Sequence, residues 1–274
     1  MSARRKSQDG EPDEAAAGNA AGQELVTVLV PCRNEEASIG PCLESVLAQT
    51  YRNLQVVVVD GCSTDGTLQL LDALRRRDPR VEVCVVERRS IPAALNVGLA
   101  AARGTWLVRV DGHSTIPADY VDRATARLRE GRWAGVGGRK DGVGRTPAGR
   151  AISAVMASRF GVGNSTYHHG TTACEVDHVP FGAYSVERAR AIGGWDERLT
   201  ANEDYEFDYR LRKAGGALLF DPMLRIDWQT RQSTRDLARQ YYRYGRGKAD
   251  VAALHPRSLS PRHLAPPAFV AYVA

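Results

Sequence analysis

The chain has 274 residues, of which 43% are hydrophobic and 25% are charged. These proportions are typical of globular proteins and exclude a wholly disordered chain and a collagen-like chain. The sequence contains no run of 18 apolar residues, so it predicts no membrane-spanning helix within its length. A net charge of +5 is too small for a general nucleic-acid-binding protein, and we expect no nucleic-acid partner.

The first segment, residues 1–24, is polar and rich in alanine and glycine. No apolar stretch follows its basic start, which argues against a signal peptide and predicts a disordered N-terminal tail. The five cysteines are scattered and include no CxxC pair. We therefore expect reduced thiols in a cytoplasmic protein rather than a disulfide framework or a zinc site.

Four apolar stretches alternate with helical patterns in the first half of the chain. The stretches indicate strands buried on both faces of a parallel sheet, and they cover residues 25–30, 56–59, 81–86 and 105–110. Helical patterns lie between them, at residues 39–47, 68–74 and 92–102. This alternation predicts a mostly parallel, Rossmann-like α/β sheet flanked by helices.

Polar residues follow three of these strands, at the sheet edge where ligands of open α/β folds bind. They are Pro31, Arg33 and Glu35 after the first strand, Asp60 after the second, and Asp111 and His113 after the fourth. A single aspartate there is often only a turn former, but three polar groups at one edge favour a binding site. Asp111 and His113 offer ligands for Mg²⁺ or Mn²⁺, although an isolated Asp-x-His pair is a weak signal.

The second half of the chain is less regular. The glycine-rich residues 135–144 lack the spacing of a phosphate-binding loop, and we expect a mobile loop there. The polar residues 164–172, which include His168 and His169, are predicted to form a flexible loop near an acceptor. Two glycines predict a turn that presents Trp195, either to a sugar or, as is commoner for tryptophan, to the core.

A helix is predicted from Glu203 to Ala214, with Asn202 as its cap and two glycines at its end. Asp204 falls on the apolar face of this helix, where it could face a cleft. Acidic residues also favour a helix N-terminus because of the macrodipole. The dipole lowers the pKa of an acid, which opposes a role as general base unless burial raises that pKa again.

The C-terminal segment, residues 225–274, is basic and expected to be helical. Residues 225–263 hold nine arginines or lysines and three aspartates, a net charge of +6. This charge suits an anionic substrate or membrane surface, or simply a solvated helix face. The chain then ends in an apolar stretch, from which we expect a natural protein that continues into membrane helices.

Six short motifs, taken in this order and spacing, carry a family resemblance. They are VPCRNEE (30–36), VVDGCSTDGT (58–67), VDGH (110–113), GGWDE (193–197), NEDYE (202–206) and QYYRY (240–244). The chain resembles inverting family 2 glycosyltransferases of GT-A fold over about residues 25–265. Within that family it is most similar to bacterial exopolysaccharide enzymes of the succinoglycan type.

The resemblance implies a role for each matched residue. Pro31, Arg33 and Glu35 would contact the donor nucleotide, and Asp60 its base, usually uracil. Asp111 and His113 would occupy the place of the DxD motif and hold Mg²⁺ or Mn²⁺ on the donor diphosphate. Asp204 would be the catalytic base, and Glu203 and Trp195 would contact substrate. The family's QxxRW motif, which helps to bind the diphosphate or the acceptor, would be Gln240, Arg243 and Tyr244.

This chain departs from the family pattern at three places, with Gly61 for an acid, His113 for the second aspartate and Tyr244 for tryptophan. The resemblance implies a catalytic domain over 25–224, with a nucleotide-binding half (25–115) and an acceptor half (116–224). It implies transfer from a nucleotide-diphospho-sugar, usually a UDP-sugar, to a glycan or lipid-linked oligosaccharide. We expect this reaction at the cytoplasmic face of the membrane, with peripheral membrane contact.

Two other classes of protein are weighed against this interpretation. A sugar-nucleotide nucleotidyltransferase should carry a glycine-rich phosphate loop after the first strand, where this chain has Pro-Cys-Arg-Asn-Glu. A non-catalytic carbohydrate-binding protein would not need Asp111, His113 and Asp204 together. Release of UDP from UDP-sugars would favour the transferase, and release of pyrophosphate the nucleotidyltransferase.

Overall fold

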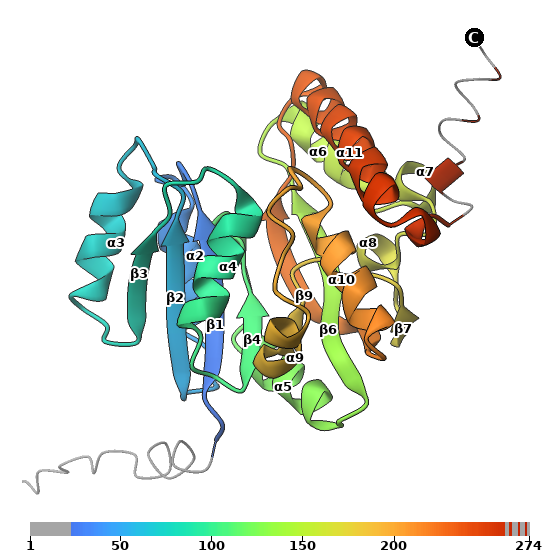
Figure 1. Cartoon of the computed structure of the whole chain (residues 1–274). Coiled ribbons are helices and arrows are strands. Elements are labelled where there is room, and N and C mark those ends of the chain that lie inside the picture. Colours follow the sequence, from blue (N-terminus) through green and yellow to red (C-terminus); the bar gives the residue numbers. More distant parts are fainter. Residues whose placement is uncertain (1–22, 261–262, 265–267, 269–271, 273–274) are drawn as a thin grey trace, which may run out of the picture.

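The computed structural model describes residues 23–260, 263, 264, 268 and 272. Nearly all of the expected N-terminal tail (1–24), and most of the apolar ending, lie outside the described residues. In the described part, nine strands form one sheet in the order β3-β2-β1-β4-β8-β6-β9-β5, and β7 pairs with β9. Helices cover both faces of this sheet (Figure 1).

The first four strands are parallel to one another, which confirms the predicted sheet. They are β1 (Val26–Cys32), β2 (Leu54–Asp60), β3 (Val81–Val85) and β4 (Trp106–Arg109). Both β1 and β2 are buried along their whole length, because helices pack on either side of them. The connecting helices are α2 (Ile39–Leu47), α3 (Thr67–Arg75) and α4 (Ile91–Ala101).

The sheet continues with strands of mixed direction. Strand β8 is antiparallel to both β4 and β6, whereas β6 and β9 are parallel. The remaining strands are β5 (Ser114–Thr115), β6 (Trp133–Val143), β7 (Cys174–Val176), β8 (Ala183–Ser185) and β9 (Ala217–Gln229). The remaining helices are α5 (Tyr120–Arg129), α6 (Pro147–Met156), α7 (Arg159–Val162), α8 (Thr166–His169), α9 (Val186–Ala191), α10 (Glu203–Lys213), α11 (Thr234–Leu254) and the short 3₁₀ helix Pro256–Ser258.

Two hydrophobic cores hold the helices to the sheet. One core packs Val28 and Val58 against α2 and α5. The other packs Leu29 and Val57 against α4, α9 and α10. Neighbouring residues of one strand thus serve opposite cores, as the two-residue period of a strand requires. This arrangement brings the start of α10 close to the carboxyl ends of the parallel strands.

The prediction of a mobile loop at residues 135–144 is wrong, because most of this stretch belongs to the long strand β6. Its glycines allow close packing rather than flexibility. A Cβ atom on Gly135 would lie 2.6 Å from the ring of Tyr184, and one on Gly138 would lie 1.8 Å from the carbonyl oxygen of Leu224. The polar stretch 164–172 likewise contains a short helix, α8.

The C-terminal segment begins differently from the expectation. Strand β9 runs through the expected boundary between residues 224 and 225, and the basic helix α11 follows it. In the part of the chain that the structure describes, no helix combines the length and the apolar character needed to cross a bilayer. The expected continuation into membrane helices stays a prediction.

Candidate active site

Two cavities meet at the carboxyl ends of the parallel strands. The smaller has a volume of about 250 Å³ and lies between the residues that follow β1 and the start of α4. The larger has a volume of about 630 Å³ and is lined by residues of β6, α8, α10 and α11. Ile91, Asp111 and His113 line both cavities, so these residues mark their junction.

The smaller cavity contains most of the predicted nucleotide contacts. Pro31, Arg33 and Glu35 all line it. Asp60 is fully buried behind the wall, where its Oδ1 accepts a hydrogen bond of 2.8 Å from the backbone N–H of Ser63. That bond shapes the loop after β2, so Asp60 acts there as a turn former.

Asp111 and His113 are each held by a neighbouring side chain. The buried Arg109 donates from Nε to Asp111 Oδ1 at 2.8 Å. His113 Nδ1 lies 3.0 Å from Glu35 Oε1, so its Nε2 is the ring nitrogen left for a ligand.

Among the described residues, no group of three or more histidine, cysteine or acidic side chains is arranged to hold a metal ion. Asp111 and His113 nevertheless fit Mg²⁺ or Mn²⁺, because Mg²⁺ characteristically takes one or two protein carboxylates and completes its shell with substrate phosphates and water. A donor set of one carboxylate and one imidazole at the junction of two cavities suits that mode.

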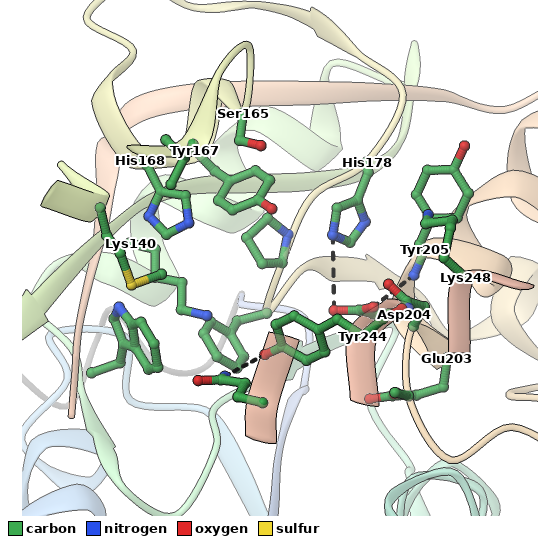
Figure 2. A pocket seen from close by; sticks show the side chains of 18 of the residues that line it. Lys140, Ser165, Tyr167, His168, His178, Glu203, Asp204, Tyr205, Tyr244 and Lys248 are labelled. Carbon is green, nitrogen blue, oxygen red and sulfur yellow. Dashed lines mark hydrogen bonds and ion pairs between the residues drawn. The ribbon is translucent and has the colours of Figure 1, made fainter. Parts of the chain in front are cut away.

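Asp204 and Glu203 line the larger cavity at the start of α10 (Figure 2). The Asp204 side chain is 29% exposed and that of Glu203 is 9% exposed. Burial raises the pKa of Asp204, but the facing His178 and Arg109 outweigh it, and the net pKa lies below its usual value. Burial and the charge of Asp204 raise the pKa of Glu203. Asp204 is therefore ionised at neutral pH, as a general base must be.

A histidine that the sequence analysis missed lies between two aspartates of α10. His178 Nε2 is 3.8 Å from Asp204 Oδ2, and its Nδ1 is 2.8 Å from Asp208 Oδ2. The fully buried Asp208 also accepts hydrogen bonds from the Tyr184 hydroxyl and the Val179 backbone N–H. Burial lowers the pKa of His178, but the two aspartates outweigh it and the net pKa is raised.

The predicted QxxRW counterpart also lies at the larger cavity. Gln240, Arg243 and Tyr244 all line it. The buried Gln240 donates from Nε2 to the Tyr244 hydroxyl at 2.6 Å and accepts from Arg231 Nε at 3.1 Å. Gln240 thus holds two other cavity residues in position.

Trp195 and Asn202 do not have the roles expected of them, as a substrate contact and as a helix cap. Trp195 lines neither cavity: it is 3% exposed and stacks on Phe207 with ring centroids 4.3 Å apart, which is a packing role. The predicted capping by Asn202 is wrong, because its side chain accepts no hydrogen bond from the helix. Asn202 has a left-handed φ of 59°, and its amide donates to the Tyr244 carbonyl, which links α10 to α11.

Besides His178, the sequence analysis missed other charged or polar residues of the two cavities. Arg89 and Ser90 follow the third strand, so the carboxyl-edge argument could have included them. Arg109 interrupts an apolar strand, and a charged residue in such a strand indicates a buried charge that is paired. Lys140 was missed because its stretch, residues 135–144, is predicted to be a loop and in fact belongs mostly to β6.

A model of the family described as "Glycosyl transferase family 2" matches residues 27–176. The succinoglycan biosynthesis protein ExoA of Rhizobium meliloti is 32% identical over 255 residues, which cover 90% of this chain and 77% of ExoA.

Solved structures are similar in fold. The mannosyltransferase PcManGT of Pyrobaculum calidifontis, in complex with GDP-Man and Mn²⁺, has a TM-score of 0.64 and 22% identity, covering 96% of this chain and 71% of that one. TarS of S. aureus, in complex with UDP-GlcNAc, has a TM-score of 0.60 and 24% identity, covering 76% of this chain. The chain spans 59% of that TarS chain. These likenesses confirm the predicted GT-A fold.

Proposed function

The chain belongs to glycosyltransferase family 2, and from this premise we propose that it transfers a sugar, with inversion, from a nucleotide-diphospho-sugar to a hydroxyl group of a glycan or lipid-linked acceptor. The observation that carries the proposal is the junction of two cavities at Asp111 and His113, with Asp204 in the wall of the larger one. One cavity would take the nucleotide of the donor and the other its sugar together with the acceptor.

The smaller cavity positions the donor in this proposal. Arg33 and Glu35 would contact the nucleotide, and the diphosphate would lie beside Asp111 and His113. A divalent cation, Mg²⁺ or Mn²⁺, held there would supply positive charge for the departing diphosphate. The hydrogen bond from Arg109 Nε to Asp111 Oδ1 holds the carboxylate of Asp111 in place at the junction.

Asp204 performs the proton transfer. Its carboxylate takes the proton of the acceptor hydroxyl, and the acceptor oxygen forms a bond to the anomeric carbon. The bond between that carbon and the diphosphate oxygen breaks, and its electron pair leaves with the nucleoside diphosphate. Because this is a single displacement from the opposite face, the anomeric configuration is inverted and no covalent glycosyl-enzyme forms.

The proposal extends to the substrate class. Similarity to ExoA supports a role in exopolysaccharide synthesis. The motif resemblance favours a UDP-sugar, and the TarS structure with UDP-GlcNAc agrees with it. PcManGT binds GDP-Man instead, so a donor screen should include both nucleotides.

Peripheral contact with an anionic membrane surface is also proposed. Arg239, Tyr242 and Arg246 recur at helical spacing on α11 and are exposed, Tyr242 to 71%. Basic and aromatic side chains on one helix face suit anionic lipid headgroups. Cosedimentation should show binding to phosphatidylglycerol vesicles that 1 M salt reverses, and none to phosphatidylcholine vesicles. Equal binding to both would contradict this part of the proposal.

A product assay tests the proposed activity. The protein is incubated with UDP-sugars and GDP-sugars in the presence of Mn²⁺, and the released products are identified. Slow release of the nucleoside diphosphate and free sugar is expected, since water can replace the acceptor. Pyrophosphate among the products would favour a nucleotidyltransferase, and no turnover of any donor, with or without added glycan, would favour a binding protein.

A further inference from the structure

Cations and aromatic rings alternate across the wall of the larger cavity. The Arg109 guanidinium carbon lies 5.6 Å from the centre of the Phe181 ring. The Lys140 ammonium lies 4.8 Å from the same ring and 3.8 Å from the centre of the Trp228 ring. All four side chains line the cavity, and Figure 2 shows that Lys140 extends into it toward the side occupied by Tyr244.

The backbone at Phe181 is constrained as well. Its φ is +51°, in the left-handed region that bulky residues rarely adopt. Such strain persists only where the surrounding structure enforces it, and it is concentrated at functional sites. Here the ring of Phe181 lies within reach of both cations, Arg109 and Lys140.

Lys140 has no acidic partner in the part of the chain that the structure describes. No described carboxylate oxygen lies within 4.0 Å of its ammonium group, which instead lies over the rings of Phe181 and Trp228. Burial lowers its pKa to about 8, so it still carries a charge at neutral pH. A charge that is removed from water without a counter-ion is costly, and such groups mark sites that a ligand completes.

The nearby acids are already engaged. Asp111 is bonded to Arg109, and Asp204 faces His178. Arg231 also lies near Lys140, close enough to lower its pKa. Among the described residues, the side-chain hydrogen bond of Arg231 goes to the neutral side chain of Gln240. In the part of the chain that the structure describes, neither Lys140 nor Arg231 has a carboxylate within ion-pair distance.

His168 does not change that balance. Burial, followed by the charge of Lys140, lowers the pKa of His168 to about 3. It is neutral near pH 7, so it neither adds to the positive charge nor offsets it.

We propose that Lys140 and Arg231 form a subsite in the larger cavity that binds a phosphate group of a substrate. An ammonium and a guanidinium together suit phosphate oxygens, to which both donate charge-assisted hydrogen bonds. A neutral sugar would not require an ammonium group that lacks a carboxylate partner. This inference rests on the proposed function, in which two substrates carry phosphate: the donor, through its diphosphate, and a lipid-linked acceptor, through its own.

Binding measurements on the full chain distinguish these sources. The variants are Lys140→Gln and Arg231→Gln, with Lys140→Arg to retain the charge and Lys213→Gln, an exposed lysine on α10, as the control. UDP and uridine are titrated calorimetrically with Mg²⁺ in excess. Pyrophosphate is then titrated into UDP-saturated protein, again with Mg²⁺ in excess over both anions.

Either of two results supports the subsite. If it holds the donor diphosphate, Lys140→Gln weakens UDP binding by about tenfold or more, on the scale of a lost charged hydrogen bond, while uridine binding is unchanged. If it holds an acceptor phosphate, UDP binding is unchanged and pyrophosphate binding to the UDP-saturated protein is lost. In both cases Lys140→Arg and Lys213→Gln behave like the wild type.

Unchanged binding of both UDP and pyrophosphate by Lys140→Gln and Arg231→Gln would overturn the proposal and leave Lys140 with a packing role against Trp228. If the Lys140 variant does not fold, Arg231→Gln decides, because Arg231 is exposed. A wild-type protein that binds no nucleoside diphosphate would contradict the proposed donor, and pyrophosphate titrated into the free protein would then test the subsite by itself.

Discussion

The two cavities are built in different ways. The smaller one is formed by the ends of parallel strands and the residues directly after them, whereas the larger one collects side chains from β6, α8, α10 and α11. Short segments near one sheet edge make the first cavity, and contacts between remote segments make the second. The smaller cavity is thus encoded largely by local sequence, whereas the larger cavity depends on tertiary packing.

The cavities also differ in how they hold charge. In the larger cavity, Asp204 faces His178, and His178 is anchored by the fully buried Asp208. In the smaller cavity, Glu35 pairs with His113, with 3.0 Å between Glu35 Oε1 and His113 Nδ1. We therefore expect substitutions in the larger cavity to affect chemistry, and those at the junction to affect donor binding.

The largest effect is expected from Asp204→Asn. Removal of the base should lower kcat for transfer by about 10²- to 10⁴-fold, the usual contribution of general base catalysis. The dissociation constant for UDP should stay unchanged, because Asp204 lies away from the smaller cavity. Steady-state kinetics and calorimetry on the same preparation measure the two quantities.

Glu203→Gln is the matched control, since Glu203 is adjacent, acidic and less exposed. Its kcat should fall by much less than that of Asp204→Asn. The reverse order of the two variants would transfer the role of base to Glu203, and normal transfer by Asp204→Asn would refute the assignment.

A smaller effect, confined to binding, is expected at the junction. Asp111→Asn should weaken Mn²⁺-dependent binding of UDP by about tenfold or more, on the scale of a charged contact. Asp119→Asn serves as the control, because Asp119 pairs with Arg123 and lines neither cavity. An undiminished dependence of UDP affinity on Mn²⁺ in Asp111→Asn would show that the metal is held elsewhere.

The smallest effect concerns two histidines of the larger cavity. NMR titration should give His178 a pKa above 6.5, raised by Asp204 and Asp208 against the opposing effects of burial and Lys248, whereas His168 should stay neutral at every pH above about 3. In Asp204→Asn the pKa of His178 should fall. Equal pKa values for the two histidines would contradict the described pairing.

The same shift has a consequence for stability. Because folding raises the pKa of His178, its protonated form contributes stability below pH 6.5, and that contribution is lost as the pH rises through the folded-state pKa. As the pH rises through that range, the free energy of unfolding of the wild type should therefore decrease. The decrease should be smaller in Asp204→Asn, because the pKa of His178 is raised less in that variant.

The sequence predicted the parallel half well because buried strands and their polar ends follow each other directly. It also placed Asp204 and the helix from Glu203 correctly, since helical spacing is a local property. It missed β6 because packing glycines resemble loop glycines. The left-handed Asn202 and the pairing of His178 with Asp208 depend on contacts between segments that are far apart in the chain, which no local pattern reveals.

A crystal structure of the protein with UDP and Mn²⁺ bound would test the proposed donor site most directly. We expect the nucleotide to lie in the smaller cavity, with its diphosphate beside Asp111 and His113. Asp204 should lie across the junction, with room for a sugar between it and the diphosphate. A nucleotide bound wholly within the larger cavity, or a diphosphate remote from Asp111, would contradict the proposed donor site.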